Sequence, residues 1–278
     1  MGRIAIIGLG LMGGSLGYAL RGFEDAELTG SSRQAIVREQ TVQKGAVDKA
    51  YSTAREAARG AGLVILCVPP HAVASLIYEC APVMAQGGLM TDICGVKTGL
   101  YESIEIPQKI DYIGIHPMAG REVDGFESAL PDLFVNTGFL ITPLPDTLPK
   151  SIERMKSLAA HIGATKISVT DPATHDAVIA YTSDLMHVSA AALCMDYHPE
   201  MTGAFCAGAF RDCTRIANIN AELWTELLLD NRDYTAEALR RYIGRLQEVE
   251  KALSNNDNVL LRNLLQQAHD NKVTMLCK

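Results

Sequence analysis

Four stretches of this sequence hold residues whose types and spacing could do chemistry. His116 is the simplest candidate for proton transfer, because an imidazole titrates near physiological pH. Arg215 is the simplest candidate for binding an anion, because an unpaired guanidinium in an otherwise apolar helix would be unfavourable, and a substrate carboxylate would supply the anion. The four stretches are residues 92–97 (DICGVK), residues 116–122 (HPMAGRE), His175-Asp176 with Asp184 and His187 on the same helical pattern, and residues 210–217 (FRDCTRIA).

Some of these residues also have a simpler structural interpretation. Asp92 could cap the helix that follows it. His175 and Asp176 fall in the first turn of an expected helix, and we interpret them as residues that serve its cap. His116, in contrast, leaves the end of the strand expected at residues 112–115, where α/β sheets place their ligands.

An N-terminal glycine motif predicts a dinucleotide site. Residues 8–13 read G-x-G-x-x-G, follow a strand and open a helix, which is the context that the motif requires. Gly8 permits the tight turn, Gly10 lets the backbone approach a pyrophosphate, and Gly13 lets the helix pack close to the strand. The free N–H groups and the positive dipole end of that helix would bind the phosphates.

The end of the second strand bears on the choice of cofactor. An acidic residue there would bind the ribose 2′-hydroxyl of NAD. This chain has Ser31, Ser32 and Arg33 instead, and two hydroxyls with a guanidinium suit a 2′-phosphate. NADP is therefore favoured over NAD, with use of both, and a merely solvated Arg33, as the alternatives. The expected cofactor-binding residues are Gly8, Leu9, Gly10, Leu11, Met12, Gly13, Ser31, Ser32, Arg33, Val68 and Asp92.

Short apolar runs alternate with helical patterns through the first half of the chain. Strands separated by helices imply right-handed crossovers and a mostly parallel sheet. The expected fold is α/β, with an N-terminal Rossmann-type domain (residues 1–169) and an all-α C-terminal domain (residues 170–278). Strands are expected at residues 3–7, 27–30, 63–68, 89–91, 112–115, 139–142 and 166–168, and helices at 11–20 and 150–161.

From Asp171 onward the pattern is helical. Asp171 and Pro172 form a good helix start, an N-cap followed by proline in the first turn. Residues 221–253 read as one long amphipathic stretch and residues 258–276 as another. Their broad apolar faces predict a homodimer formed through the helical domain, with a monomer as the alternative.

Composition excludes several classes of protein. The 278 residues are 48% hydrophobic and 21% charged, enough for two globular domains. The net charge of −7 and the lack of a basic face argue against a nucleic-acid partner. Seven irregularly spaced cysteines without a C-x-x-C pair indicate neither a metal site nor a disulfide framework. No signal peptide or membrane-spanning apolar stretch is read, so a cytoplasmic protein without a membrane partner is expected.

Taken together, the motifs resemble the prephenate/arogenate dehydrogenase family. The N-terminal nucleotide motif, D-x-x-x-V-K, H-P-M-A-G and R-D-x-T-R-I-A occur in the family's order, with Trp224 downstream. The resemblance implies NAD(P)-dependent oxidative decarboxylation of prephenate, a small dicarboxylate, to 4-hydroxyphenylpyruvate in tyrosine biosynthesis. Arogenate dehydrogenase is the alternative. A 3-hydroxyacid dehydrogenase is less favoured, because those enzymes rely on a lysine in the helical domain and none occurs between Lys166 and Lys251.

The resemblance also implies roles for single residues. His116 would be the catalytic histidine that accepts a hydrogen bond from the ring hydroxyl, and Arg215 would anchor a substrate carboxylate. Two positions depart from the family: many members have serine at Gly95, and many have histidine at Asp184. The implied substrate-binding residues are Arg215, His187, Glu122, Gly95, Asp212 and Trp224. A non-catalytic nucleotide sensor, which would need neither His116 nor Arg215, is the competing class.

Overall fold

The computed structural model describes residues 2–121, 123–196, 198, 200 and 203–276. Glu122, implied to touch the substrate, lies outside the described residues. The chain divides into two compact units, Met1–Asn231 and Arg232–Lys278, and each is described by itself.

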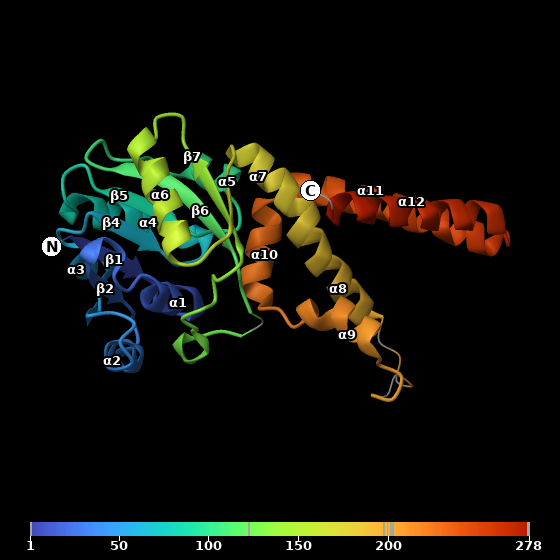
Figure 1. The fold of residues 1–278 in the computed structure, drawn as a ribbon, viewed down its shortest axis with the longest axis horizontal. Helices are drawn as coiled ribbons and strands as arrows, with labels where there is room; N and C mark the ends of the chain where they lie inside the picture. Colours follow the sequence, from blue (N-terminus) through green and yellow to red (C-terminus); the bar gives the residue numbers. More distant parts are fainter. Residues whose placement is uncertain (1, 122, 197, 199, 201–202, 277–278) are drawn as a thin grey trace. The chain divides into compact units, whose positions relative to one another are not determined.

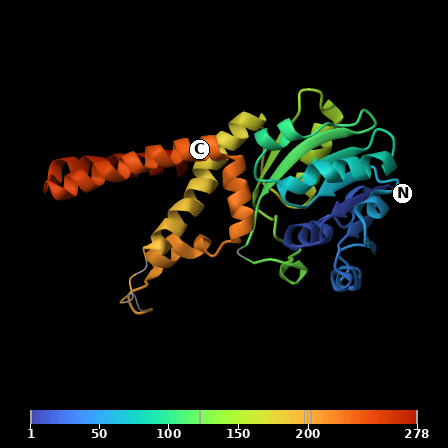
Figure 2. The same ribbon diagram turned by 180° about the vertical axis from the view of Figure 1, so that it is seen from behind.

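An eight-stranded sheet forms the centre of the first unit (Figures 1 and 2). Its strand order is β3-β2-β1-β4-β5-β6-β7-β8, and every neighbouring pair is parallel except β6 and β7. The expected mostly parallel sheet is therefore confirmed. The strands are β1 (Arg3–Ile7), β2 (Glu27–Ser31), β3 (Lys49–Tyr51), β4 (Leu63–Leu66), β5 (Leu89–Asp92), β6 (Asp111–Met118), β7 (Gly138–Pro143) and β8 (Lys166–Val169). The three-residue β3 was not predicted, because it lacks an apolar run.

Helices cover both faces of this sheet. Alternate residues of each strand point to opposite faces, so Ile4 and Ile6 join one core and Ala5 and Ile7 the other. The first core contains side chains of α1 and α6, and the second contains side chains of α3, α4 and α5. The helices of the sheet region are α1 (Leu11–Ala19), α2 (Ala35–Gln43), α3 (Ala54–Ala58), α4 (Pro70–Cys80), α5 (Thr98–Ser103) and α6 (Pro149–His161).

β6 is longer than expected, and this changes the setting of His116. The strand continues to Met118 because it pairs antiparallel with β7, where His116 lies opposite Leu140. The expectation that His116 leaves the strand end was therefore wrong. The parallel pairing with β5 ends at Gly114, so His116 still lies beyond the carboxyl end of β5 while the β7 ladder holds its backbone.

A helical region completes the first unit. It consists of α7 (Pro172–Ile179), a π-helical turn (Ala180–Asp184), α8 (Leu185–Met195), α9 (Gly208–Thr214), a 3-10 turn (Arg215–Ala217) and α10 (Ala221–Asp230). The predicted start of α7 is confirmed, because the Asp171 side chain accepts a hydrogen bond from the Thr174 backbone N–H and Pro172 begins the helix.

The continuous helical run Pro172–Met195 is long and apolar enough, by length and composition, to cross a membrane. The expectation that no stretch has this length was therefore wrong. Three polar side chains of this run, His175, Asp176 and Asp184, are only 1–3% exposed. All three have hydrogen-bond partners outside their own helical run, as buried polar groups in a folded domain require.

The long helix expected at residues 221–253 is interrupted. α10 ends at Asp230, and α11 begins at Arg232. The side-chain amide of Asn231 donates to the backbone carbonyl of Asp176 at 3.1 Å and to Asp184 Oδ2 at 2.7 Å. These buried bonds hold Asn231 outside helical geometry and end α10 there.

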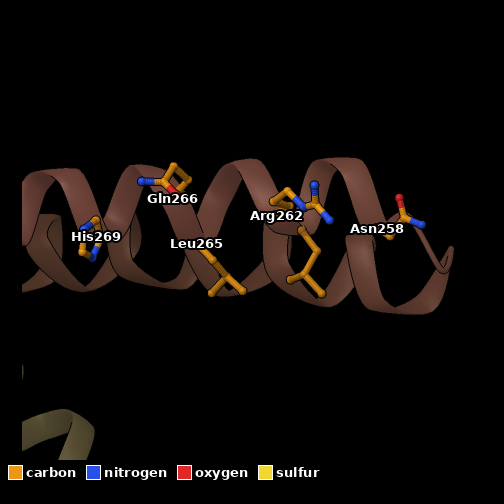
Figure 3. Close-up of a pocket in the computed structure, with 6 residues that line it drawn as sticks. Asn258, Arg262, Leu265, Gln266 and His269 are labelled. Carbon is orange, nitrogen blue, oxygen red and sulfur yellow. The ribbon is translucent and has the colours of Figure 1, made fainter.

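The second unit is a pair of helices, α11 (Arg232–Ser254) and α12 (Asn258–Leu276), which pack on each other. The predicted bounds of α12 are confirmed. Large apolar side chains on both helices remain exposed, among them Leu246, Leu253, Leu265 and Val273. A shallow hollow also follows one face of α12, lined by Asn258, Leu261, Arg262, Leu265, Gln266 and His269 (Figure 3).

Candidate active site

The glycine loop has the geometry that a dinucleotide needs. Gly8 has φ +98°, and a Cβ there would collide with the carbonyl oxygen of Cys67. A Cβ on Gly13 would collide with the carbonyl oxygen of Gly8, so α1 can pack this close to β1 only with glycine. Gly10, the N-cap of α1, has nothing within 4 Å of its Cβ position. The space above Gly10, at the N-terminal end of α1, is therefore open to a pyrophosphate.

The side chains between these glycines belong to the core. Leu9 is 3% exposed and Leu11 is 9% exposed, so only their backbones can contact a nucleotide. Met12 is half-buried and packs against the first core. Val68, just after β4, packs against the second core and lies near Gly8.

The end of β2 presents hydroxyl and guanidinium groups. Ser31 is buried, Ser32 is half-buried and Arg33 is exposed. The Ser32 hydroxyl oxygen accepts a hydrogen bond from the Gln34 backbone N–H at 3.3 Å. Arg38, which was not among the predicted cofactor residues, donates from Nη1 to the carbonyls of Ser32 at 2.7 Å and Arg33 at 3.0 Å. A second guanidinium therefore lies at the loop where a 2′-phosphate would bind.

Asp92 is completely buried at the end of β5, and its carboxylate is fully engaged. It pairs with the Lys97 ammonium at 2.6 Å and accepts hydrogen bonds from the Tyr112 hydroxyl at 2.8 Å and the Cys94 backbone N–H at 2.9 Å. Lys97 also donates to the carbonyl of Ile115 at 2.9 Å. These contacts make Asp92 an anchor for the loop and strand on either side of His116, and it does not cap α5.

His116 contacts a second histidine. Its Nδ1 lies 3.0 Å from Nε2 of His175, and the two ring centroids are 5.2 Å apart. Burial lowers the pKa of His116 well below its usual value, and the nearby His175 and Lys97 lower it further. His116 is therefore a neutral imidazole at physiological pH, which is the form that can accept a proton.

The interpretation of His175 and Asp176 as capping residues of their own helix was wrong. His175 Nδ1 lies 2.7 Å from Asp176 Oδ1, and both side chains are 1% exposed. Asp176 also accepts hydrogen bonds from the backbone N–H groups of Lys97 at 3.0 Å and Thr98 at 2.7 Å. Asp176 therefore caps the start of α5, a helix distant in sequence, while Asp171 caps α7.

Gly95 lies against the other side of the His116 ring. A Cβ on Gly95 would be 3.7 Å from His116 Cε1 and 3.8 Å from His116 Nε2, which is ordinary van der Waals contact. The Nε2 atom, the one not directed at His175, therefore faces the position where many family members have a serine. A serine side chain would fit there.

α10 lies beside the carboxyl edge of the sheet, between the sheet and α8 (Figure 1). Its Trp224 stacks on His187 of α8, with ring centroids 3.7 Å apart and an interplanar angle of 29°. His187 Nδ1 lies 3.0 Å from the Ser183 carbonyl, to which it donates. One turn further along α10, Leu227 lies 3.8 Å from the Cβ position of Gly95. Two expected substrate residues, one from α8 and one from α10, thus meet one helical turn from the residue that lies beside Gly95.

A contact with no signal in the sequence joins α10 to the sheet domain. Glu226 accepts hydrogen bonds from the His71 backbone N–H at 2.7 Å and pairs with His71 Nδ1 at 2.8 Å. His71 belongs to the first turn of α4, directly after the β4 loop. The Glu226 carboxylate therefore caps α4 and holds α10 over the sheet edge.

Arg215 and Asp212 come from a third element. Asp212 lies in α9 and Arg215 begins the 3-10 turn that packs on α8. Both residues are exposed in this chain, so the expectation of an arginine buried in an apolar helix was wrong. Among the described residues, no group of three His, Cys, Asp or Glu side chains could hold a metal ion.

Comparison with known proteins identifies the family. Residues 16–168 match the family described as "Prephenate dehydrogenase, nucleotide-binding domain", and residues 171–267 match "Prephenate dehydrogenase, dimerization domain". The prephenate dehydrogenase of Lactococcus lactis is 30% identical over 96% of this chain and 75% of its own length. The cyclohexadienyl dehydrogenase of Zymomonas mobilis is 29% identical over 92% of this chain and 89% of its own length.

Solved structures agree with this assignment. The arogenate dehydrogenase of Synechocystis superposes with a TM-score of 0.79 at 28% identity, covering 98% of this chain and 99% of its own. The prephenate dehydrogenase of Aquifex aeolicus, solved with hydroxyphenyl propionate and NAD+, superposes with a TM-score of 0.87, covers 99% and 98% of the two chains, and at 23% identity shows the shared fold. Because the family match extends through both the sheet and the helical region, the chain belongs to the prephenate dehydrogenase family, whose members are NAD-dependent dehydrogenases that oxidise and decarboxylate their substrate.

Proposed function

We propose that this protein converts prephenate to 4-hydroxyphenylpyruvate and carbon dioxide, with a nicotinamide nucleotide as the oxidant. The observation that carries the proposal is the position of His116. A neutral imidazole lies at the carboxyl edge of a sheet whose glycine loop fits a dinucleotide, and its Nε2 faces Gly95. Trp224, on the helix whose Leu227 lies beside Gly95, stacks on His187 of α8.

The chemistry needs a base and an electron acceptor. The bound nicotinamide supplies the acceptor for the hydride that leaves the carbinol carbon. His116 accepts the proton of the ring hydroxyl as the carbonyl forms. The new carbonyl is conjugated to the carbon that bears the ring carboxylate, so it can take up the electron pair as carbon dioxide leaves. The resulting oxygen then regains a proton and the ring is aromatic.

Binding requires groups that recognise two carboxylates and a ring. We propose that Arg215 pairs with one carboxylate, because its guanidinium is accessible and forms forked, charge-assisted bonds. His187 would line the substrate pocket, Asp212 and Trp224 would lie near its mouth, and Glu122 would contact the substrate side chain. Gly95 would leave room beside His116 for the ring hydroxyl.

We propose NADP as the preferred cofactor, with NAD as the alternative. The support is the loop after β2, which carries Ser32 and the exposed Arg33 and has the Arg38 guanidinium bound to its carbonyls. Asp92, also expected at the cofactor, would act only by positioning the loop after β5, since its carboxylate is engaged.

We propose that residues 1–169 bind the nucleotide and that residues 170–278 form the substrate and dimerisation domain of a cytoplasmic homodimer. The family described as a dimerization domain matches residues 171–267. Exposed apolar side chains on α11 and α12, such as Leu246 and Leu265, support burial against a second copy.

An absorbance assay for reduced nicotinamide tests the function. Prephenate and arogenate are each offered with NAD and with NADP. Turnover of prephenate supports the proposal, and the larger kcat/KM of the two nucleotides assigns the cofactor. Turnover of arogenate alone assigns the alternative, which similarity to the Synechocystis arogenate dehydrogenase favours. Nucleotide binding without any turnover would contradict both dehydrogenase functions and would favour a non-catalytic nucleotide sensor.

A further inference from the structure

We propose that His175 and Asp176 extend His116 into a proton relay, which holds the substrate's hydroxyl proton during hydride transfer and returns it to the product. The proposal rests on the proposed function, because the proton is that of the substrate's ring hydroxyl. His175 and Asp176 are not inferred to touch the substrate, and they act through His116 as positioning and proton-holding residues.

Hydrogen bonds fix which nitrogen of each ring carries a proton. Asp176 is an anionic acceptor, so His175 Nδ1 must be the donor in their 2.7 Å contact. In a neutral His175 the Nε2 atom is then an acceptor, and His116 Nδ1 must donate across the 3.0 Å contact. His116 Nε2 is left with a free lone pair, and it faces Gly95. The carboxylate therefore orients the base through two rings.

Asp176 is held in its charged form although it is buried. Burial acts to raise the pKa of the Asp176 carboxyl, but hydrogen bonds from His175 and from the backbone of Thr98 outweigh it and lower the pKa below its usual value. The Lys97 backbone N–H is a third donor to this carboxylate. A buried anion with three fixed donors is a stable end point for a hydrogen-bonded chain.

The reaction gives such a relay a use, because it releases no proton overall. Prephenate and the oxidised nucleotide together carry the same net charge as hydroxyphenylpyruvate, carbon dioxide and the reduced nucleotide, so the proton that leaves the ring hydroxyl is matched by one that the phenolate oxygen regains. A lone buried His116 beside the Lys97 ammonium would hold it poorly, since the same burial and charges favour its neutral form.

The step balances as a paired transfer. The hydroxyl proton moves to His116 Nε2, and the His116 Nδ1 proton moves to His175 Nε2. His175 becomes an imidazolium next to the Asp176 carboxylate, at a contact distance of 2.7 Å. Both protons move back when the phenolate oxygen forms. The charged groups around the relay are Lys97, paired with Asp92, and Asp184, bound to Asn231.

His175→Gln tests the relay in the full-length enzyme. The glutamine carbonyl can still accept the His116 Nδ1–H bond and orient the ring, but it cannot take up a proton. We expect kcat to fall by about ten-fold or more, a smaller loss than removal of the base itself, with KM for prephenate changed little. His161→Gln is the matched control, because His161 is exposed on α6 and bonds only the Arg21 carbonyl among the described contacts.

Asp176→Asn provides a second variant with a distinct readout. Loss of the carboxylate weakens the base, so the plateau of kcat/KM should fall and its acid-side midpoint should move to lower pH. A residue that only supports the fold would not move that midpoint. Imidazole ¹⁵N spectra of the wild type should show His116 and His175 both protonated at Nδ1 at neutral pH.

The outcomes separate the two proposals. Turnover by His175→Gln at the wild-type kcat, or an Nε2-protonated His116 in the spectra, would overturn the relay while leaving the proposed function intact. A wild-type enzyme without activity on either substrate would instead remove the proposed function, and the spectra would still test the hydrogen-bonded chain. If His175→Gln fails to fold, Asp176→Asn and the wild-type spectra decide the matter.

Discussion

Nδ1 of His116 lies 3.0 Å from Nε2 of His175, a residue 59 positions later in the chain. The contact joins the central sheet to the first helix of the helical region. It determines which ring nitrogen of His116 carries the proton, although the sequence alone presents this base as a single histidine.

Replacing His116 with glutamine should remove most of the turnover. The base acts mainly in the transition state, so we expect kcat to fall by about 10²- to 10⁴-fold with KM for prephenate changed much less. Steady-state kinetics with circular dichroism as the folding check make the measurement. A variant with wild-type kcat would exclude His116 as the base.

The stability of the protein should depend on pH through the same histidine. Burial depresses the pKa of folded His116 below the unfolded value of 6.5, so the unfolded chain binds the proton more readily. This contribution is fully present above 6.5 and is lost as pH falls toward the folded pKa. Denaturant titrations from neutral to acidic pH should show the decline, and His116→Gln should flatten it; identical slopes for both proteins would contradict the pKa direction.

Gly95→Ser should strengthen the site. The serine Cβ would lie 3.8 Å from His116 Nε2. Its hydroxyl could form a hydrogen bond to the substrate's ring hydroxyl, next to the one that His116 accepts. One additional hydrogen bond predicts a rise in kcat/KM of about two- to ten-fold. Gly62→Ser, whose Cβ position has nothing within 4 Å, adds the same hydroxyl just before β4 and should leave activity unchanged. A loss of activity in Gly95→Ser alone would mean that the space beside His116 must stay open.

Two arginines at the loop after β2 should select the cofactor. Arg33→Ala removes a guanidinium of the loop itself, and Arg38→Ala removes the α2 guanidinium that donates to the loop carbonyls. We expect kcat/KM for NADP to fall about ten-fold or more in each, as for loss of a charge-assisted bond, while NAD serves as the internal control. Equal losses for both nucleotides would mean that these side chains do not read the 2′-phosphate.

The buried Lys97–Asp92 pair should make a single substitution costly. Both side chains are completely buried, so Lys97→Met leaves an unpaired carboxylate in the core. We expect a loss of about 3–5 kcal/mol in the free energy of unfolding, measured with denaturant. The double variant Lys97→Met with Asp92→Asn should recover part of it. A single variant as stable as the wild type would show that the pair is not desolvated.

Contiguous residues determined much of this protein. The glycine loop, the Asp171–Pro172 start of α7 and the buried strand β1 each depend on neighbours within one turn or one strand, so their spacing was enough to predict them. The HPMAG and RDxTRIA motifs were likewise enough to predict the family, although they did not predict the distances between their side chains.

Tertiary structure alone decided which buried polar groups meet. Asp176 accepts from Thr98, Asn231 ends α10 by bonding Asp184, and Glu226 caps α4 through His71, across separations of 78, 47 and 155 residues. A buried donor or acceptor must find a partner, but its own sequence neighbourhood does not specify which one. Packing of α7 and α10 against the sheet makes that choice, and it turned two residues that read as a helix cap into the support of His116, the proposed catalytic histidine.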